Sequence, residues 1–228
     1  MPILKSVNQD FFKRWSPEMA YVLGFFAADG CITVSKRNTH FFSIHIKDRE
    51  LLKNIQSVMG SNHKISKRIH SKDGSICYRL QIGSKEIFND LTSLGFKPGK
   101  TLSMAVPYVP KNRLSDFVRG YFDGDGNVWM GTTHNNRKKK SLSLRTGFTS
   151  CSGDFLRSLK DSLHSWGIFG RLYCRKGYFR LYYSTRSSIK LFSLMYESGY
   201  RSYIHLERKR RVFEKFIENR NAPVDQFG

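Results

Sequence analysis

Two aspartates, Asp29 and Asp125, stand at equivalent places in the chain, because each follows a short apolar stretch and is followed by glycine. Carboxylate oxygens bind hard divalent cations, and Mg²⁺ is usually held by one or two carboxylates together with phosphate oxygens. Two such ions roughly 4 Å apart can activate a water molecule and stabilise the leaving oxygen of a phosphodiester. If the fold brings these aspartates together, they predict metal-assisted hydrolysis of a phosphodiester bond.

A repeated segment contains both aspartates. The letters YVLGFFAADGCITV at residues 21–34 resemble FVRGYFDGDGNVWM at residues 117–130, with Gly24 matching Gly120. A single DGDG is more often a turn than a catalytic site. Its counterpart on a second apolar stretch, in a strongly basic chain, favours a functional interpretation. The fixed offset predicts two equivalent halves.

Each repeated segment is expected to be a buried helix, because it is apolar on all sides. Small residues lie four apart, at Gly24 and Ala28 in the first segment and at Gly120 and Gly124 in the second. Glycine inside a helix costs about 1 kcal/mol relative to alanine, so these positions require a reason. Close approach of two backbones is such a reason. Packing through these faces would place the two aspartates side by side, at the negative ends of two helix dipoles, where a cation is favoured.

The patterns that follow each motif predict the order α-β-β-α-β-β-α in both repeats, and therefore an α+β fold of two pseudo-symmetric halves. Asp48 and Ser152 are the expected N-caps of the middle helices. We predict three parts: an N-terminal repeat over residues 1–96, a proline-containing linker over residues 97–112, and a C-terminal repeat over residues 113–228 that ends in a basic helix over residues 205–220.

The charge of the chain indicates a polyanionic partner. There are 39 Lys and Arg against 18 Asp and Glu, which gives a formal net charge of +21. Such an excess points to nucleic acid or to an anionic membrane surface. The longest apolar run, residues 19–28, is about half of what a membrane span needs. No signal region is present and the four cysteines form no CxxC pair, so we expect an intracellular protein, not secreted, with reduced thiols.

The two motifs, VLGFFAADG and VRGYFDGDG, resemble the LAGLIDADG motif of homing endonucleases, and the likeness extends over roughly residues 16–216. The resemblance implies a site-specific endonuclease that cuts both strands of DNA. It also implies a monomer with a pseudo-twofold axis, in which two saddle-shaped, curved antiparallel sheets lie along the major groove of a long asymmetric site. The expected partner is therefore double-stranded DNA, with no membrane and no obligate protein partner.

The resemblance also assigns the metal site. It implies that the last aspartate of each motif binds Mg²⁺, with Mn²⁺ able to substitute and Ca²⁺ expected to bind without supporting cleavage. The residues carried over to the metal site are Asp29, Asp125, Ala28 and Gly124. One departure is Ala27, where the motif has its first aspartate, whereas Asp123 fills that place in the second copy. That position usually serves packing or capping, so we expect activity to survive the difference.

Polar residues often lie near the metals in this family. By motif alignment we place a basic one at Lys85 and another at Arg186, each at the start of the last helix of its repeat. A second position, often glutamine, falls near Ile46 in the first repeat and Ser150 in the second. Ile46 cannot orient water, so we expect two chemically unequal half-sites.

Strand alternation predicts which side chains face DNA, because one face of each sheet packs on helices. Ile32 and Val34 are expected to point inward. In the first repeat the outward set is Thr33, Ser35, Arg37, Lys64, Ser66, Arg68, His70, Arg79 and Gln81. In the second repeat it is Trp129, Arg145, Arg171, Tyr173, Arg175, Arg180 and Tyr182, with a phosphate-binding loop at Arg137, Lys138, Lys139 and Lys140. The basic stretch at residues 205–211 is expected to coat the outer surface, with phosphate binding as the alternative.

Other functions stay open. An RNA maturase that assists intron splicing could use the same scaffold and keep both carboxylates. A noncatalytic DNA-binding regulator should have lost at least one of them, and this chain keeps both. The repeat argues against an unrelated basic nucleic-acid-binding module. We do not expect an intein, because the sequence begins Met1-Pro2 and ends Phe227-Gly228, with no splicing nucleophile or terminal asparagine.

Overall fold

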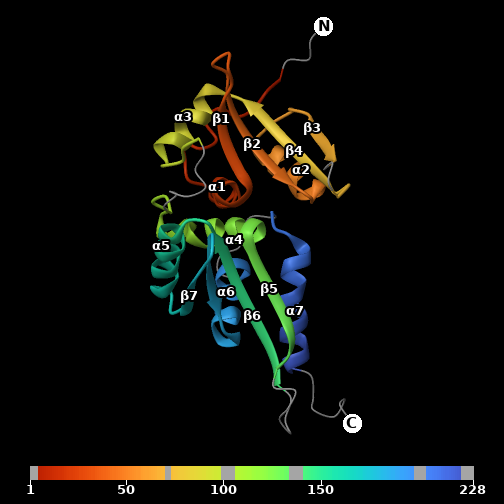
Figure 1. Cartoon of the computed structure of the whole chain (residues 1–228), viewed down its shortest axis with the longest axis vertical. Coiled ribbons are helices and arrows are strands. Elements are labelled where there is room, and N and C mark those ends of the chain that lie inside the picture. Colours follow the sequence, from red (N-terminus) through yellow and green to blue (C-terminus); the bar gives the residue numbers. More distant parts are fainter. Residues whose placement is uncertain (1–4, 70–72, 99–105, 134–140, 198–203, 222–228) are drawn as a thin grey trace.

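The computed structural model describes residues 5–69, 73–98, 106–133, 141–197 and 204–221. Two halves with the same order of elements lie one above the other (Figure 1). The first half consists of α1 (Pro17–Asp29), β1 (Gly30–Val34), β2 (His40–Ile46), α2 (Arg49–Val58), β3 (Ile65–Ile69), β4 (Ile76–Gly83) and α3 (Lys85–Ser93).

The second half repeats this order and adds one helix. After a short 3₁₀ turn, η2 (Lys111–Arg113), it consists of α4 (Leu114–Asp125), β5 (Gly126–Thr133), β6 (Ser141–Ser150), α5 (Gly153–His164), β7 (Gly170–Arg175), β8 (Tyr178–Tyr183), α6 (Thr185–Tyr196) and α7 (Glu207–Asn221). The predicted α-β-β-α-β-β-α order is confirmed in both halves. The extra C-terminal helix is also confirmed, within two residues of its predicted bounds.

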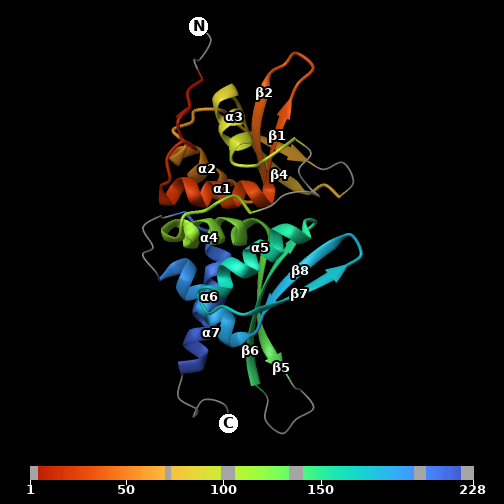
Figure 2. The ribbon, with the colours of Figure 1, turned by 90° about the vertical axis from the view of Figure 1, so that its left-hand side faces the viewer.

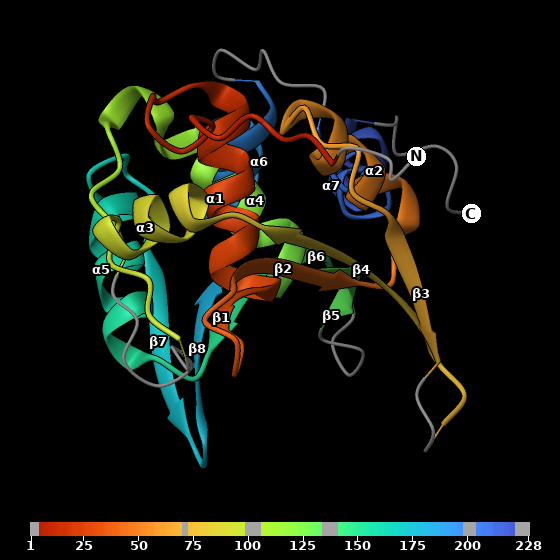
Figure 3. The same cartoon turned by 90° about the horizontal axis from the view of Figure 1, so that it is seen from above.

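The two sheets have the same topology. Each has four antiparallel strands, in the order β1-β2-β4-β3 in the first half and β5-β6-β8-β7 in the second. In Figure 3 the hairpins β3–β4 and β7–β8 extend away from the central helices in different directions. Helices α2 and α3 cover one face of the first sheet, and α5 and α6 cover the corresponding face of the second. Within the described residues, the other face of each sheet has no covering helix and is called the uncovered face.

Side-chain caps fix the start of several helices. Ser16, Asp48, Ser84 and Ser152 each accept a hydrogen bond from a backbone N–H three residues further on. Such a bond satisfies one of the N–H groups that the first helical turn leaves without a partner. The predicted caps at Asp48 and Ser152 are therefore confirmed.

The two residues expected to point inward differ in exposure. Ile32 is buried, whereas Val34 is 45% exposed although alternation keeps it on the same face of β1 as Ile32. Val34 is the last residue of β1, which is an edge strand of its sheet. Alternation gives the correct side of a strand, but it does not tell how far along the strand the covering helices reach.

The two halves meet through α1 and α4, which lie side by side across the centre of the molecule (Figure 2). Residues 19–27 of α1 are all buried. A Cβ atom added to Gly24 would lie 2.0 Å from the carbonyl oxygen of Phe117, and one added to Gly120 would lie 2.0 Å from that of Tyr21. The predicted close approach of the two backbones is therefore confirmed, and it leaves no space for a side chain at either glycine.

This contact makes a prediction about stability. Gly120→Ala should lower the free energy of unfolding by about 1–3 kcal/mol, because an added methyl group must push two backbones apart in a packed core. Gly83→Ala is the control, because a Cβ there would meet its nearest neighbour, the ring of Phe41, at 3.6 Å, an ordinary contact. Urea denaturation of both variants measures the effect. Equal midpoints for Gly120→Ala and the original protein would contradict the close packing.

Candidate metal centre and nucleic-acid interface

Asp29 and Asp125 are the last residues of α1 and α4, and the helix contact brings them into one place. A Cβ added to Gly124 would lie 2.3 Å from the Cβ of Ala28 and 3.2 Å from Oδ2 of Asp29, so the Asp29 carboxylate reaches the residue next to Asp125. Asp29 is half-buried and Asp125 is exposed.

The negative charges of both carboxylates affect the pKa of the Tyr121 hydroxyl. Its pKa is raised far above the ordinary value, mainly by burial, then by the negative charge of Asp125, with a further contribution from Asp29. This hydroxyl donates a hydrogen bond to the carbonyl oxygen of Thr149, 2.9 Å away. Because both charges act on the same buried phenol, the two carboxylates form one negative centre.

A cavity of about 540 Å³ opens beside Asp29. Besides Asp29 it is lined by His45, Ile46, Lys47, Asp48, Cys77, Asp123, Gly124 and Arg208. Lys47 was not singled out from the sequence, whereas Arg208 lies in the stretch at residues 205–211 for which phosphate binding was the alternative. Lys47 directly follows Ile46, which motif alignment had already placed near the metals. Its position next to Ile46 could therefore have predicted Lys47 at this cavity. Two basic side chains beside a carboxylate provide positive charge where a phosphate would approach.

His45 lies in the same cavity and faces away from the core. Its pKa is lowered from the ordinary value, mainly by burial and further by the positive charges of Arg79 and Arg68. At neutral pH its imidazole is therefore predominantly uncharged, with one nitrogen able to donate a hydrogen bond and the other able to accept one.

The structure places Lys85 away from the carboxylates. The N–H of Ser84 donates to the carbonyl oxygen of His40, and His40 is paired with Val34. Val34 is four residues beyond Gly30, so with a rise of about 3.4 Å per residue Lys85 starts roughly 14 Å along the strand from the end of α1. The expectation that Lys85 lies beside the metal site is therefore wrong, although it does begin the last helix of its half.

Arg186 is displaced in the same way. Leu144 donates its N–H to Oγ1 of Thr185 and is paired with Met130, four residues beyond Gly126. Arg186 therefore also starts roughly 14 Å from the end of α4 along the strand. Motif alignment gave the correct helix in both halves, but the start of that helix lies about four strand residues away from the aspartate.

The other alignment-based positions do lie near the carboxylates. Ile46 and Ser150 each stand two residues beyond the partner of the glycine that follows the motif. Ile46 lines the cavity beside Asp29, and the Ser150 hydroxyl accepts a hydrogen bond from the N–H of Ser152. The difference between an apolar and a polar side chain at these places makes the two half-sites unequal.

Asp123 is structural. It is 2% exposed, and its Oδ2 accepts hydrogen bonds from the Tyr21 hydroxyl at 2.7 Å and from the N–H of Leu206 at 2.8 Å. Burial raises the pKa of this carboxyl, while the hydrogen bond from Tyr21 and the charge of Lys209 oppose the rise. It connects α4 to α1 and to the start of α7, in agreement with a packing role.

Lys209 corrects the view that residues 205–211 only coat the surface. It is 6% exposed, and its ammonium donates to the carbonyl oxygens of Phe122, Asp123 and Gly126, around the end of α4, and lies near that of Gly124. Its pKa is lowered to about 8, mainly by burial, although the negative charge of Asp123 opposes this. The contact to Gly124 is the longest, at 3.3 Å. Because a positive charge already touches that oxygen, the Gly124 carbonyl is a poorer metal ligand than the carboxylates.

The uncovered face of the first sheet carries most of the predicted outward residues. Strand pairing puts Ser66 opposite Arg79 and Arg68 opposite Cys77, while Gln81 is paired with Ser43. Alternation along the strands then puts Thr33, Ser66, Arg68, Arg79 and Gln81 on this face, and Lys64 directly precedes β3. Ser35 and Arg37 differ, because they lie in the turn after β1, where the Ser35 hydroxyl accepts from the N–H groups of Arg37 and Thr39.

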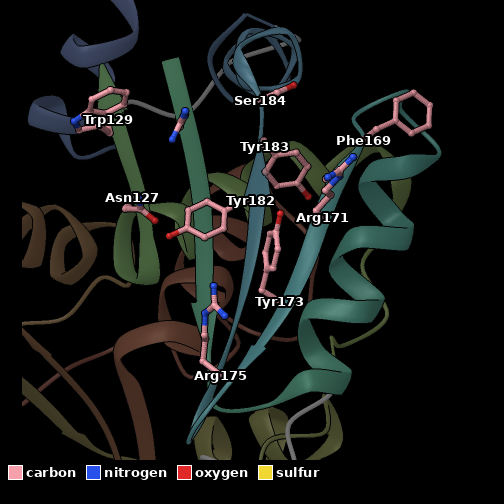
Figure 4. Close-up of a pocket in the computed structure, with 11 residues that line it drawn as sticks. Asn127, Trp129, Phe169, Arg171, Tyr173, Arg175, Tyr182, Tyr183 and Ser184 are labelled. Carbon is pink, nitrogen blue, oxygen red and sulfur yellow. The ribbon is translucent and has the colours of Figure 1, made fainter. Parts of the chain in front are cut away.

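The uncovered face of the second sheet is an array of arginines and aromatic rings around a depression of about 1020 Å³ (Figure 4). The guanidinium of Arg145 lies 5.6 Å from the Trp129 ring, that of Arg175 lies 5.6 Å from the Tyr173 ring, and that of Arg180 lies 5.3 Å from the Tyr182 ring. Arg171 also lines the depression, whereas Arg180 is not among the residues that line it. Contact with a ring reduces the conformational freedom of an arginine side chain. These guanidinium groups are therefore preorganised to bind an anion or the edge of a base.

Five predicted contacts lie outside the described residues, namely His70, Arg137, Lys138, Lys139 and Lys140. Among the residues that the structure does describe, no helix has the length and apolar character needed to cross a membrane.

Comparisons of the sequence and of the structure with known proteins point to the same family. The family described as "LAGLIDADG-like domain" matches residues 16–94 and 113–218. Among curated proteins, the chain is 24% identical over 219 residues to the replication factor C small subunit of Methanocaldococcus jannaschii. The aligned region is 92% of this chain but only 11% of that protein. An uncharacterized protein of the same organism is 24% identical over 218 residues, which is 90% of this chain and 73% of that protein.

Solved structures share the fold. The LAGLIDADG meganuclease I-AabMI, solved bound to uncleaved DNA, aligns with a TM-score of 0.59 at 17% identity and covers 90% of both chains. The meganuclease I-SmaMI, bound to uncleavable DNA, aligns with a TM-score of 0.61 at 15% identity over 89% of this chain and 91% of that one. Variants of the homing endonuclease I-DmoI align with a TM-score of 0.53 at 16% identity, covering 87% of this chain and 95% of that one.

The structural role of Asp123 is testable. Asp123→Ala should lower the free energy of unfolding by about 3–5 kcal/mol, because the buried Lys209 ammonium loses its nearest negative charge and two donors lose their acceptor. Asp154→Ala serves as control, since its ion pair with Arg157 is exposed and worth at most about 1 kcal/mol. Denaturant unfolding measures the free energy of unfolding of both variants. If the Asp123→Ala protein is as stable as the Asp154→Ala protein, Asp123 does not have this structural role.

Proposed function

The chain belongs to the LAGLIDADG-like family, and from that premise we propose that it is a site-specific endonuclease that cuts both strands of duplex DNA with the help of divalent metal ions. The observation that carries the proposal is the meeting of Asp29 and Asp125 at the ends of two helices that touch through glycines. The chain covers 11% and 9% of the length of two of its curated relatives, so their overall activities are not transferred to it.

The residues at the centre fit a hard divalent cation. Two carboxylates offer oxygen donors, and they lie at the negative ends of two helix dipoles, where a cation is favoured. Within the described part of the chain no three His, Cys, Asp or Glu side chains converge on one point. Protein carboxylates would therefore occupy only part of the coordination shell of a Mg²⁺ ion, and phosphate oxygens and water suit the remaining positions.

When bound, such ions supply an activated water molecule and neutralise the charge that develops on the leaving oxygen. The protein residues have separate tasks. Asp29 and Asp125 hold the cations, while Lys47 and Arg208 attract the phosphate toward the cavity beside Asp29. Mg²⁺ is the proposed ion, with Mn²⁺ as a substitute and Ca²⁺ as an ion that permits binding without cleavage.

The two uncovered sheet faces are the proposed DNA-binding surfaces. Their basic side chains, together with the net charge of +21, suit a polyanion. Arginine can contact two acceptors on the major-groove edge of guanine, and glutamine can do so with adenine. The faces differ, because the second is rich in arginine–aromatic pairs, so the proposed site is asymmetric. Both carboxylates lie in one chain, and we propose that the protein acts as a monomer.

A selection experiment tests the function. The protein is incubated with a library of random duplexes and Mg²⁺, and the cleaved molecules are sequenced. The proposal predicts recovery of a long, asymmetric consensus site. Recovery of no cleaved duplex, combined with stimulated splicing of an intron RNA in a parallel assay, would favour a maturase instead. A site with perfect dyad symmetry would count against the monomer.

The metal centre gives the next prediction. Asp29→Asn or Asp125→Asn should reduce cleavage of the selected duplex by roughly 10³-fold or more, since the loss of metal binding removes several kcal/mol of transition-state stabilisation. A carboxamide has nearly the shape of a carboxylate, so the helix packing should persist. Cleavage rates are measured in Mg²⁺ and dissociation constants in Ca²⁺.

The binding measurement separates the metal role from a structural one. The dissociation constants of both variants should stay close to the original value or decrease, because removal of an anion near the phosphates relieves repulsion. Asp154→Asn provides the control, because it removes the same charge from an exposed position on α5. Nearly normal cutting by either motif variant would show that the active site has been misplaced.

The second sheet yields a prediction about recognition. Arg145→Ala should raise the dissociation constant for the selected duplex by about 5- to 150-fold, which corresponds to roughly 1–3 kcal/mol for a bidentate base contact. Arg157→Ala removes the same charge from an exposed position on α5 and is the control. Duplexes with single base changes are then compared. If Arg145→Ala weakens binding to all of them equally, Arg145 contacts phosphate rather than a base.

A further inference from the structure

A buried lysine sits against the end of one carboxylate-bearing helix. Lys209 belongs to α7, and its ammonium lies 2.6 Å from the carbonyl oxygen of Phe122, 2.8 Å from that of Asp123 and 2.6 Å from that of Gly126. A fourth carbonyl, that of Gly124, is 3.3 Å away. The ammonium has three N–H groups, and the three short contacts engage all of them.

The position of these carbonyls relative to Asp125 is informative. Three of them precede Asp125 and one follows it, so a single ammonium is bonded to the backbone on both sides of the aspartate. The last carbonyls of a helix have no N–H partner within the helix and form the negative end of its dipole. The Asp125 carboxylate adds a full negative charge at the same place, and the Lys209 charge offsets both.

The apolar side of α7 fixes Lys209 in this place. Phe213 and Phe216 are buried on the same face of the helix, and the Phe213 ring lies 5.7 Å from that of Phe122. The N–H of Leu206 is held by the Asp123 carboxylate at the start of α7. Helix α7 is therefore attached to the last turn of α4 through apolar packing, a carboxylate and an ammonium.

We propose that Lys209 is a positioning residue for Asp125. Lys209 holds the end of α4 in the conformation in which Asp125 binds metal, and Lys209 does not itself contact DNA. This inference rests on the proposed function, because it gives Lys209 a role in that same metal centre. A structural lysine on an outer helix would support folding alone. A positioning lysine must also affect how tightly Asp125 holds a metal ion.

The first test uses Lys209→Met, which keeps the length of the side chain and loses its charge and donors. Lys215→Met removes the same charge from an exposed position on the same helix and is the control. Cleavage of the selected duplex by Lys209→Met should be about 10- to 100-fold slower at limiting Mg²⁺, as for other residues that support metal ligands. Its dissociation constant for DNA in Ca²⁺ should stay within about twofold of the original.

A second measurement does not depend on catalysis. Electron paramagnetic resonance of Mn²⁺ added to the protein–duplex complex reports metal affinity, and the proposal predicts weakening of about 10- to 100-fold in Lys209→Met and none in Lys215→Met. Hydrogen exchange of the backbone amides at residues 122–127 should be faster in Lys209→Met. Both readouts stay informative if the original protein cuts no duplex, a result that would contradict the proposed function alone.

Chemical rescue gives a third readout. Lys209→Ala removes the atoms of a propylammonium ion, so added propylammonium should restore Mn²⁺ affinity and cleavage several-fold, whereas 1-propanol should not. If Lys209→Met fails to fold, Lys209→Gln replaces it, since it keeps two donors and should be intermediate in Mn²⁺ affinity. Unchanged Mn²⁺ affinity and unchanged amide exchange in the folded variant overturn the proposal. Weakened DNA binding in Ca²⁺ with normal metal affinity overturns it as well, because Lys209 would then act on DNA.

Discussion

The contact between two backbones at Gly24 and Gly120 is the constraint on which the rest of the molecule depends. A side chain at either glycine would overlap a carbonyl oxygen of the facing helix, so α1 and α4 can pack this closely only without one. The contact brings the C-terminal ends of the two helices together, and each helix ends in an aspartate. It also joins the two halves, so the relative placement of the two sheets depends on the same pair of glycines (Figure 2).

Electrostatics then divides the molecule into a negative centre and positive surfaces. Two aspartates at helix C-termini are unfavourable by themselves, because each adds a negative charge to the negative end of a dipole. The structure offsets this locally with the Lys209 ammonium. On the uncovered faces of both sheets, basic side chains are suited to a polyanion. A divalent cation would allow the negative centre and the phosphates of DNA to approach each other, since it binds both.

Much of this arrangement follows from sequence patterns whose physics is local. A helix that is apolar on all sides must be buried, and small residues four apart require a close neighbour, so the meeting of α1 and α4 could be predicted. Alternation along the strands correctly placed Ser66, Arg79 and Trp129 on the uncovered faces. The placement of Lys85 and Arg186 failed, because the order of elements does not specify distance along a strand, and four residues of strand separate each from the carboxylates.

Lys209 was missed for a different reason. It lies within a run of basic residues, which usually marks a solvated helix face. The spacing nevertheless contained a signal, because Lys209, Phe213 and Phe216 are separated by four and three positions and so share one face of α7. A lysine on the apolar stripe of an amphipathic helix requires a buried acceptor. That acceptor is the last turn of α4, nearly ninety residues earlier in the chain, and no local pattern predicts such a long-range contact.

The proposed metal centre is created by the helix contact and shared by Asp29 and Asp125. A crystal structure of the protein with its selected duplex and Mn²⁺, with data collected at a wavelength where manganese scatters anomalously, can locate the bound ions. We expect anomalous peaks within bonding distance of both carboxylates, between the ends of α1 and α4 and against phosphate oxygens of the DNA. Peaks bound elsewhere on the protein, with Asp29 and Asp125 free of metal in a complex that still cuts, would contradict it.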